Sequence, residues 1–117
     1  MLVLVGAGIG CASPLPEPGT LPPGRGFAGP WDSNWGQMRL SVEGNHVHGP
    51  YRGFRNGSVS GEQKGNLFVF RWTDVGGVQS GRGYLQMNAE GDRIEGKWGY
   101  QKSYDDGGRW WAARGTE

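Results

Sequence analysis

The sequence predicts an all-β protein, a small antiparallel up-and-down meander barrel of about eight strands. Three observations point to this fold class. Apolar and polar residues alternate through a series of short segments, which is the pattern of half-buried strands. Gly, Asn and Asp, the residues typical of turns, separate these segments. One hairpin pattern also occurs twice, and because a hairpin alone cannot bury its apolar face, we expect the copies to share a core.

The repeated hairpin covers Gly36 to Gly53 and Tyr84 to Tyr100, with Gly83 preceding the second copy. The two copies align without a gap, apolar positions on apolar positions and turn on turn. The matches are Gly36 with Gly83, Met38 with Leu85, Leu40 with Met87, Glu43-Gly44-Asn45 with Glu90-Gly91-Asp92, Val47 with Ile94, Gly49 with Gly96, and Tyr51 with Trp98. The shared pattern is a strand, a tight turn and a strand.

The alternation gives the position of each strand in order. The expected strands are Trp31 to Trp35, Gln37 to Val42, His46 to Tyr51, Gly57 to Glu62, Leu67 to Thr73, Gly81 to Met87, Arg93 to Tyr100 and Arg109 to Arg114. Most connections are short and carry Gly or Asn, and only Asp74 to Ser80 and Gln101 to Gly108 are longer. Short connections force neighbouring strands to be antiparallel, and a meander of this size can close on itself and remove both sheet edges.

The same alternation assigns side chains to the two faces of the sheet. The inner face should carry Met38, Leu40, Val42, Val47, Gly49, Tyr51, Phe68, Phe70, Trp72, Leu85, Met87, Ile94, Gly96, Trp98 and Tyr100, with Gly61 as a further inward glycine. The outer face should carry Gln37, Arg39, Ser41, His46, His48, Arg93, Glu95 and Lys97. The chain has 24 glycines and six tryptophans, so small and large residues can alternate inside a tightly curved barrel. A barrel of this size is either filled by its own side chains or holds one small ligand.

The first thirty residues show no strand pattern. Residues 1–11 form an apolar run that ends at the only cysteine, Cys11, and resemble a signal peptide or the processing site of a bacterial lipoprotein. Residues 12–30 are rich in Pro and Gly and are expected to be a disordered tether, followed by the barrel domain at 31–114 and a tail at 115–117. We therefore expect lipidation at Cys11 and a place in the cell envelope, lipid-anchored or secreted. The alternatives are a plain signal peptide and a disordered start in which the cysteine occurs by chance.

Charge and motifs argue against several functions. The net charge is +1, with basic and acidic residues interspersed, so no basic stripe is available for nucleic acid. His46 and His48 lie two apart on one strand but lack further metal ligands, and Asp105-Asp106 lacks the residue series of a calcium loop. Gly81-Arg82-Gly83 precedes no helix that would complete a phosphate site. We expect no metal, no cofactor and no enzymatic activity.

A pattern that runs from residue 29 to residue 111 resembles known proteins. It consists of Gly29-Pro30-Trp31, Gly36, Gly44, Val47, Gly49, Tyr51, Val69-Phe70-Arg71-Trp72 and Asp92-Arg93-Ile94-Glu95-Gly96-Lys97-Trp98. It is similar to the strand pattern of the avidin family of barrels. Lipocalins have the same kind of up-and-down meander. The W-x-S-x-W-G-x-M-x-L and G-x-W-G-Y motifs also resemble uncharacterised bacterial envelope lipoproteins.

The resemblance to avidins implies a ligand site lined by aromatic rings. The residues carried over are Tyr51, Trp72 and Trp98, with Trp110 or Trp111 on the last strand. Of the last two, Trp111 is the candidate site residue. Trp35 would lie at the same open end of the barrel. The polar half of the avidin site does not carry over. Ser33 stands where avidins have asparagine and Gln37 where they have serine, so biotin binding is a minor alternative.

Two function classes remain. The first is a non-enzymatic envelope module that binds a small apolar or heterocyclic ligand at the open barrel end. The second is a protein-interaction or structural barrel with a filled core, whose surface aromatics Tyr104, Trp110 and Phe54 form a patch for a protein partner. The volume of the barrel interior separates these two classes, because a void of a few hundred Å³ with convergent polar groups favours a ligand and a filled core favours a protein partner.

Overall fold

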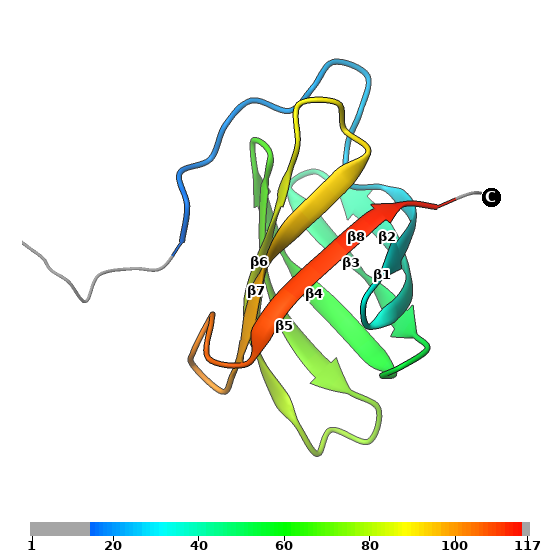
Figure 1. Ribbon diagram of the computed structural model, residues 1–117, viewed down its shortest axis with the longest axis vertical. Helices are drawn as coiled ribbons and strands as arrows, with labels where there is room; N and C mark the ends of the chain where they lie inside the picture. Colours follow the sequence, from blue (N-terminus) through cyan, green and yellow to red (C-terminus); the bar gives the residue numbers. More distant parts are fainter. Residues whose placement is uncertain (1–14, 116–117) are drawn as a thin grey trace, which may run out of the picture.

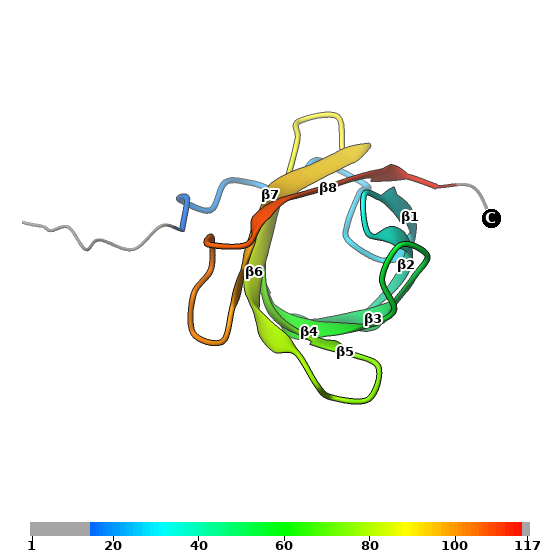
Figure 2. The ribbon, with the colours of Figure 1, turned by 60° about the horizontal axis from the view of Figure 1, so that its bottom comes forward.

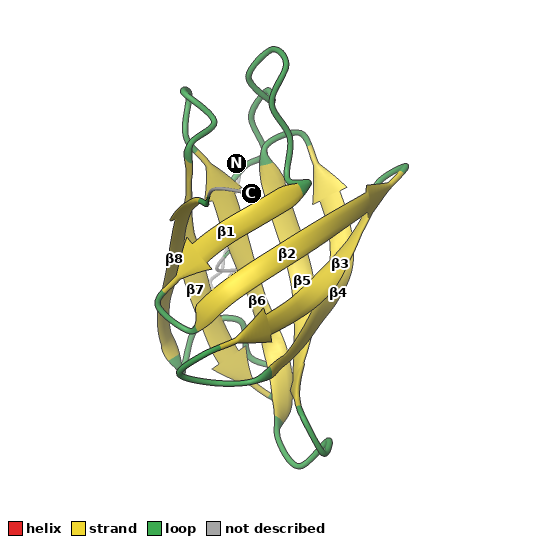
Figure 3. Ribbon diagram, turned by 90° about the vertical axis from the view of Figure 1, so that its right-hand side faces the viewer, coloured by secondary structure: helices red, strands yellow, loops and turns green. Residues whose placement is uncertain are grey.

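The computed structural model describes residues 15–115, and in this range eight antiparallel strands close into a barrel (Figures 1 and 2). The strands are β1 (Gly29–Ser33), β2 (Gly36–Glu43), β3 (His46–Arg52), β4 (Gly57–Lys64), β5 (Leu67–Asp74), β6 (Ser80–Met87), β7 (Arg93–Tyr100) and β8 (Gly108–Arg114). Strands and loops make up the whole of this part of the chain (Figure 3). The predicted all-β meander barrel is confirmed. A helix of the length and apolar character needed to cross a membrane does not occur among residues 15–115.

Each strand pairs with the next one along the chain, and β1 and β8 close the circle. The closing pair, which we call the β1–β8 seam, matches Trp31 with Arg114, Asp32 with Ala113 and Ser33 with Ala112. It is a short pairing. By contrast, β4 and β5 pair along their whole length, from Gly57 with Asp74 to Lys64 with Leu67.

The two copies of the repeated hairpin form β2–β3 and β6–β7. Their turns share one backbone feature, because Gly44 has a φ of 64° and Gly91 a φ of 77°. Both values lie in the left-handed region, which glycine enters without steric cost. The sequence match at the turn therefore reflects a shared conformation.

The barrel interior is apolar and dense. Its buried members are Trp31, Trp35, Met38, Leu40, Val47, Tyr51, Val59, Phe68, Phe70, Trp72, Leu85, Met87, Ile94, Trp98, Trp110 and Ala112, together with Phe27 from outside the strands. The predicted inner face is confirmed except at its margins: Val42 is only partly buried, and Tyr100, at the end of β7, is 41% exposed. Gly49 pairs with the inward Val59, and a Cβ atom there would overlap the carbonyl oxygen of Arg39.

Residues 15–28 pack on the barrel, which differs from the disordered tether expected for residues 12–30. This segment, which we call the strap, passes over the upper end of the barrel in Figure 1. Phe27 is fully buried with its ring centroid 5.7 Å from that of Phe68, and Leu21 packs against the core. The Gly19 N–H donates to Asn66 Oδ1 at 2.7 Å, and the Asn66 N–H donates to the Gly19 carbonyl at 3.0 Å. Proline prevents strand pairing here, but the apolar side chains still find a place in the core.

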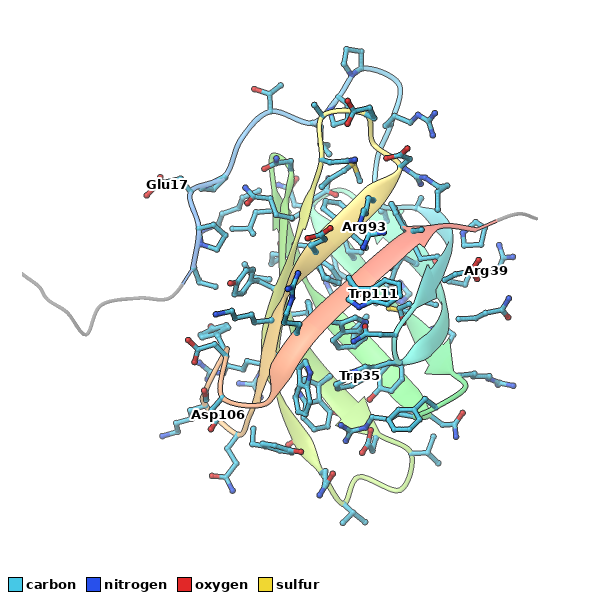
Figure 4. The ribbon with its side chains drawn as sticks, in the orientation of Figure 1. Glu17, Trp35, Arg39, Arg93, Asp106 and Trp111 are labelled. Atoms are coloured by element: carbon cyan, nitrogen blue, oxygen red, sulfur yellow. The ribbon has the colours of Figure 1, made fainter. Side chains whose placement is uncertain are left out.

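The barrel thus has two distinct ends. The strap and the turns after β2, β4 and β6 close one of them. At the other, the loops after β1, β3, β5 and β7 surround a group of tryptophans, and we call it the tryptophan end. Figure 4 shows Trp35 near this end, far from the strap residue Glu17.

Candidate functional site

Four of the predicted site residues, Trp35, Tyr51, Trp72 and Trp98, come together at the tryptophan end. The Trp35 ring, carried in by the turn between β1 and β2, lies at the centre of the group. Its centroid is 5.2 Å from that of Tyr51, 5.3 Å from Trp72 and 4.8 Å from Trp98, all in edge-to-face geometry. Such T-shaped arrangements are the preferred packing of aromatic rings. Trp72 also donates from Nε1 to the Gly99 carbonyl at 2.9 Å.

The fifth predicted residue, Trp111, lies on the outer face of the barrel, where it is 38% exposed (Figure 4). Trp110 takes its place inside: it is fully buried and stacks on Trp35 with centroids 3.9 Å apart. The assignments of Trp111 to the site and of Trp110 to a surface patch are therefore corrected. The cause is the register of β7 and β8, which pairs Trp110 with the inward Gly96 and Trp111 with Glu95.

The aromatic rings fill this end of the interior. Besides Trp35, Trp110 contacts Tyr51 and Phe70 edge to face at 5.6 and 5.3 Å. Contacts at these distances leave no room for a ligand between the rings. A hollow of about 160 Å³ lies instead over β1, β2 and β3. Its lining includes residues whose side chains alternate with the buried ones: Asp32, Gln37, Arg39, Pro50 and Arg52.

Arg55, from the loop between β3 and β4, covers the tryptophans. Its guanidinium carbon lies 4.3 Å from the ring centroid of Trp35, 5.0 Å from that of Trp72 and 5.3 Å from that of Trp98. These are cation–π distances, and Trp is the ring that attracts a cation best. The Arg55 side chain is only 17% exposed. The end that the sequence suggested would be open is thus closed by a charged side chain.

Asp74, at the end of β5, neutralises Arg55. Arg55 Nη2 donates to Asp74 Oδ2 at 2.8 Å and to Gln79 Oε1 at 3.1 Å. The Tyr51 hydroxyl donates to the other carboxylate oxygen, Asp74 Oδ1, at 2.9 Å. Burial and this hydrogen bond to Asp74 raise the pKa of Tyr51. Burial opposes the charge of Arg55, but the hydrogen bond and charge of Asp74 outweigh it, so the pKa of Arg55 is raised.

The β3–β4 loop reverses the usual placement of apolar and charged residues. Phe54 is 85% exposed, whereas its neighbour Arg55 is inserted against the rings. The Arg55 N–H donates to the Trp35 carbonyl at 3.0 Å, and the Val75 N–H donates to the Asn56 carbonyl at 2.9 Å. The loop is therefore joined to the β1–β2 turn on one side and to the β5–β6 loop on the other. Sequence reasoning missed Arg55 and Asp74, because nothing in their spacing links them.

Apolar side chains also stand at the rim of this end. Val75 and Val78 in the β5–β6 loop are 74% and 87% exposed, and Phe54 lies in the neighbouring loop. We call these three residues the apolar rim. Single exposed apolar residues are ordinary, but three on two adjoining loops form a surface that a partner or ligand can cover.

The remaining motifs have structural explanations. Gly81 and Gly83 lie inward, where a Cβ atom would press on Trp72 and Phe70. Asp106 accepts a hydrogen bond from the Tyr100 N–H at 2.8 Å and so shapes the β7–β8 loop. His46 and His48 lie side by side on the outer face with ring centroids 5.3 Å apart. Within residues 15–115, no three His, Cys, Asp or Glu side chains are grouped so that they could hold a metal ion.

The avidin-like polar positions serve other purposes here. The Ser33 hydroxyl donates to the Gly36 carbonyl at 2.6 Å and accepts from the Trp35 N–H at 3.1 Å, so it shapes the turn that carries Trp35. Gln37 is exposed on the outer face. Cys11, the predicted lipidation site, lies outside the described residues. Comparisons with protein-family models, curated proteins and solved structures found no match to this chain.

Proposed function

We propose that the chain is a non-enzymatic binding module of the bacterial cell envelope, which takes a small ligand at its tryptophan end, in the place of Arg55. One observation carries the proposal: a guanidinium group from a loop already lies against the indole rings of Trp35, Trp72 and Trp98. The ligand site is then a position at the mouth of the barrel, and the filled interior below it is its floor. A flat group in this position can stack on one indole ring while the other two, which are nearly perpendicular to it, surround its edges.

The chemistry of this end suits recognition better than catalysis. Its polar groups are a paired arginine and aspartate, a tyrosine whose raised pKa keeps it protonated, and a glutamine. A general base or nucleophile would need a pKa near the working pH or a base beside it. The raised pKa of Tyr51 disfavours the phenolate that would act as a nucleophile, and the Asp74 carboxylate beside it is already engaged by Arg55. The proposal is therefore one of binding.

The experiment is a titration of tryptophan emission with a panel of heterocycles, amines and lipids, biotin included. We expect a saturable change with at least one class of compound, because a guest must contact Trp35, Trp72 or Trp98. Trp111→Phe is the matched control: it removes a tryptophan from the outer face and should leave the change in place. Arg55→Ala should move the midpoint to lower concentration. If no compound alters the emission of either the parent or Arg55→Ala, the proposal fails.

A protein partner is the second candidate, and two observations favour it: the interior of the barrel is filled, and the apolar rim is exposed. Phe54, Val75 and Val78 are each more than 70% exposed. A photo-reactive residue at position 75 should give a defined crosslinked product in cells, and the Phe54→Ser/Val78→Ser double variant should lose it. Trp111→Ser changes an exposed aromatic of β8, a strand that is connected to neither loop of the rim, and should keep the product. Equal crosslinking by all three proteins would exclude the rim as the binding surface.

A further inference from the structure

The tryptophan end has the chemistry of a site for organic cations. Three indole rings face one guanidinium group, and one carboxylate lies beside it at 2.8 Å. Aromatic rings grouped in this way attract cations through their negative faces, and cages of this kind bind alkylammonium groups. We propose that Arg55 is the resident occupant of this cage and that a guanidinium or alkylammonium group of a ligand takes its place. The inference rests on the proposed function and names its ligand class.

The charge of Asp74 selects the ligand. Its side chain is 21% exposed, and Arg55 is its ion-pair partner. A neutral or anionic guest that displaced Arg55 would leave this carboxylate mostly buried without a counter-charge, and an unpaired buried charge is strongly unfavourable. A cationic guest restores the pair. The exchange then conserves the charge of the site: one cation leaves and one enters.

The hydrogen-bonding groups at this position also favour a donor. Asp74 Oδ2 and Gln79 Oε1 both accept from Nη2 of Arg55, at 2.8 and 3.1 Å. The one hydroxyl in contact with Asp74, that of Tyr51, is already committed as a donor to Oδ1. The acceptors Asp74 Oδ2 and Gln79 Oε1 are therefore left for the N–H groups of the occupant, and the Tyr100 side chain is a further hydrogen-bond partner of Arg55. A guanidinium group can donate to these acceptors, and its charge is attracted by the indole rings that surround it.

Arg55 is held in a way that permits exchange. It belongs to the loop at residues 53–56, where its neighbours Phe54 and Asn56 are exposed. Its side chain keeps 17% exposure, so the guanidinium reaches solvent without passing through the core. A tethered occupant nevertheless competes with any ligand, and the apparent affinity is the intrinsic affinity multiplied by the fraction of molecules in which the cage is vacant. Removing Arg55 should therefore strengthen binding of a free cation.

The test compares methylguanidinium with methylurea, a neutral compound of similar shape, on the folded chain. Tryptophan emission and melting temperature are the two measurements. We expect Arg55→Ala to bind methylguanidinium with a midpoint lower by about tenfold or more than the parent, since a minor state is populated at about 10% or less. Arg52→Ala, which removes an exposed arginine of β3, is the matched control and should behave like the parent. Methylurea should have no effect on either measurement.

The outcomes separate the two proposals. If Arg55→Ala binds methylguanidinium and methylurea equally well, the cation preference is wrong while ligand binding at this end stands. If neither compound nor any member of the panel changes emission or melting temperature, both proposals fail. Adding Asp74→Asn to Arg55→Ala should abolish the preference for the cation. Should Arg55→Ala not fold, Arg55→Gln removes the charge while keeping most of the side-chain stem, and the same comparison on it decides the question.

Discussion

At the scale of single residues, the inward glycines set how closely the strands of the barrel approach. Gly49 in β3 and Gly96 in β7 are sites where a Cβ atom would overlap a carbonyl oxygen of the neighbouring strand, that of Arg39 and that of Tyr84. Gly96 also pairs with the large Trp110. Small residues opposite large ones are what lets a narrow barrel be filled without voids.

We predict that Gly49→Val and Gly96→Val each lower the free energy of unfolding by about 1–3 kcal/mol, because a branched side chain overpacks the interior. His46→Ala and His48→Ala, on the outer face of the same barrel, should change it by less than about 0.5 kcal/mol. Denaturant unfolding of the four variants and the parent measures both effects. A melting temperature for Gly96→Val equal to that of the parent would contradict the inward assignment.

Tyr51 makes a second prediction at this scale. Its pKa is raised in the folded protein by burial and by the hydrogen bond to Asp74, so the folded state keeps its proton at a pH where the unfolded chain loses it. The stability that Tyr51 contributes is fully present below its ordinary pKa of about 10 and is lost as pH rises above that value. The free energy of unfolding of the parent, measured by denaturant unfolding at a series of pH values, should therefore lose its advantage over that of Tyr51→Phe above about pH 10. A difference in free energy of unfolding between the two proteins that stays constant with pH would contradict this.

The register at Trp110 and Trp111 marks how far residues could be assigned from sequence. Two adjacent tryptophans fit either phase of an alternating strand, so the pattern of β8 alone does not decide between them. The pairing with β7 decides it, and that pairing depends on the whole barrel. Arg55 and Asp74 were missed for a related reason. Arg55 in the β3–β4 loop and Asp74 at the end of β5 meet 2.8 Å apart, and no sequence motif links the two positions.

At the scale of elements, all eight strands were predictable and the strap was not. Alternation and turn residues are local signals, and they placed the strands to within a few residues; the largest shift is in β1, which runs from Gly29 to Ser33 and leaves Trp35 in a turn. The strap has neither signal. Its order comes from the burial of Phe27 and Leu21 and from hydrogen bonds to Asn66, which are contacts with distant strands.

The strap yields a prediction of its own. Phe27→Ala should destabilise the barrel by about 3–5 kcal/mol, the cost of removing a fully buried aromatic ring. Glu17→Ala is the matched control, because that side chain is exposed and the Glu17 carbonyl, which accepts from Gln86 at 2.9 Å, is retained. Thermal unfolding of the three proteins checks this. Equal melting temperatures for Phe27→Ala and the parent would mean that the strap is no part of the cooperative unit.

At the scale of the whole molecule, the proposed envelope location depends on Cys11. We predict that the full-length protein fractionates with membranes and incorporates labelled palmitate, whereas Cys11→Ser is released or left unprocessed. The apolar run before the cysteine and the proline-rich stretch after it occur in the order that export and anchoring require. A parent protein that takes up no label and stays in the soluble fraction inside the cell would refute the location without touching the binding proposals.

The β1–β8 seam has a consequence for how the chain reaches its native state. Every other pairing joins consecutive strands, so those hairpins form from contacts that are near in sequence and cost little loop entropy. Formation of the seam must bring residues 31–33 to residues 112–114, and the few paired positions there compensate little of this loop entropy. We therefore expect the pairing of β1 with β8 to form last during folding and to open first during unfolding. The backbone groups of Asp32 and Ala113 face each other across the seam, so native-state hydrogen exchange should report an opening of lower free energy at these two amides than at the centre of β5.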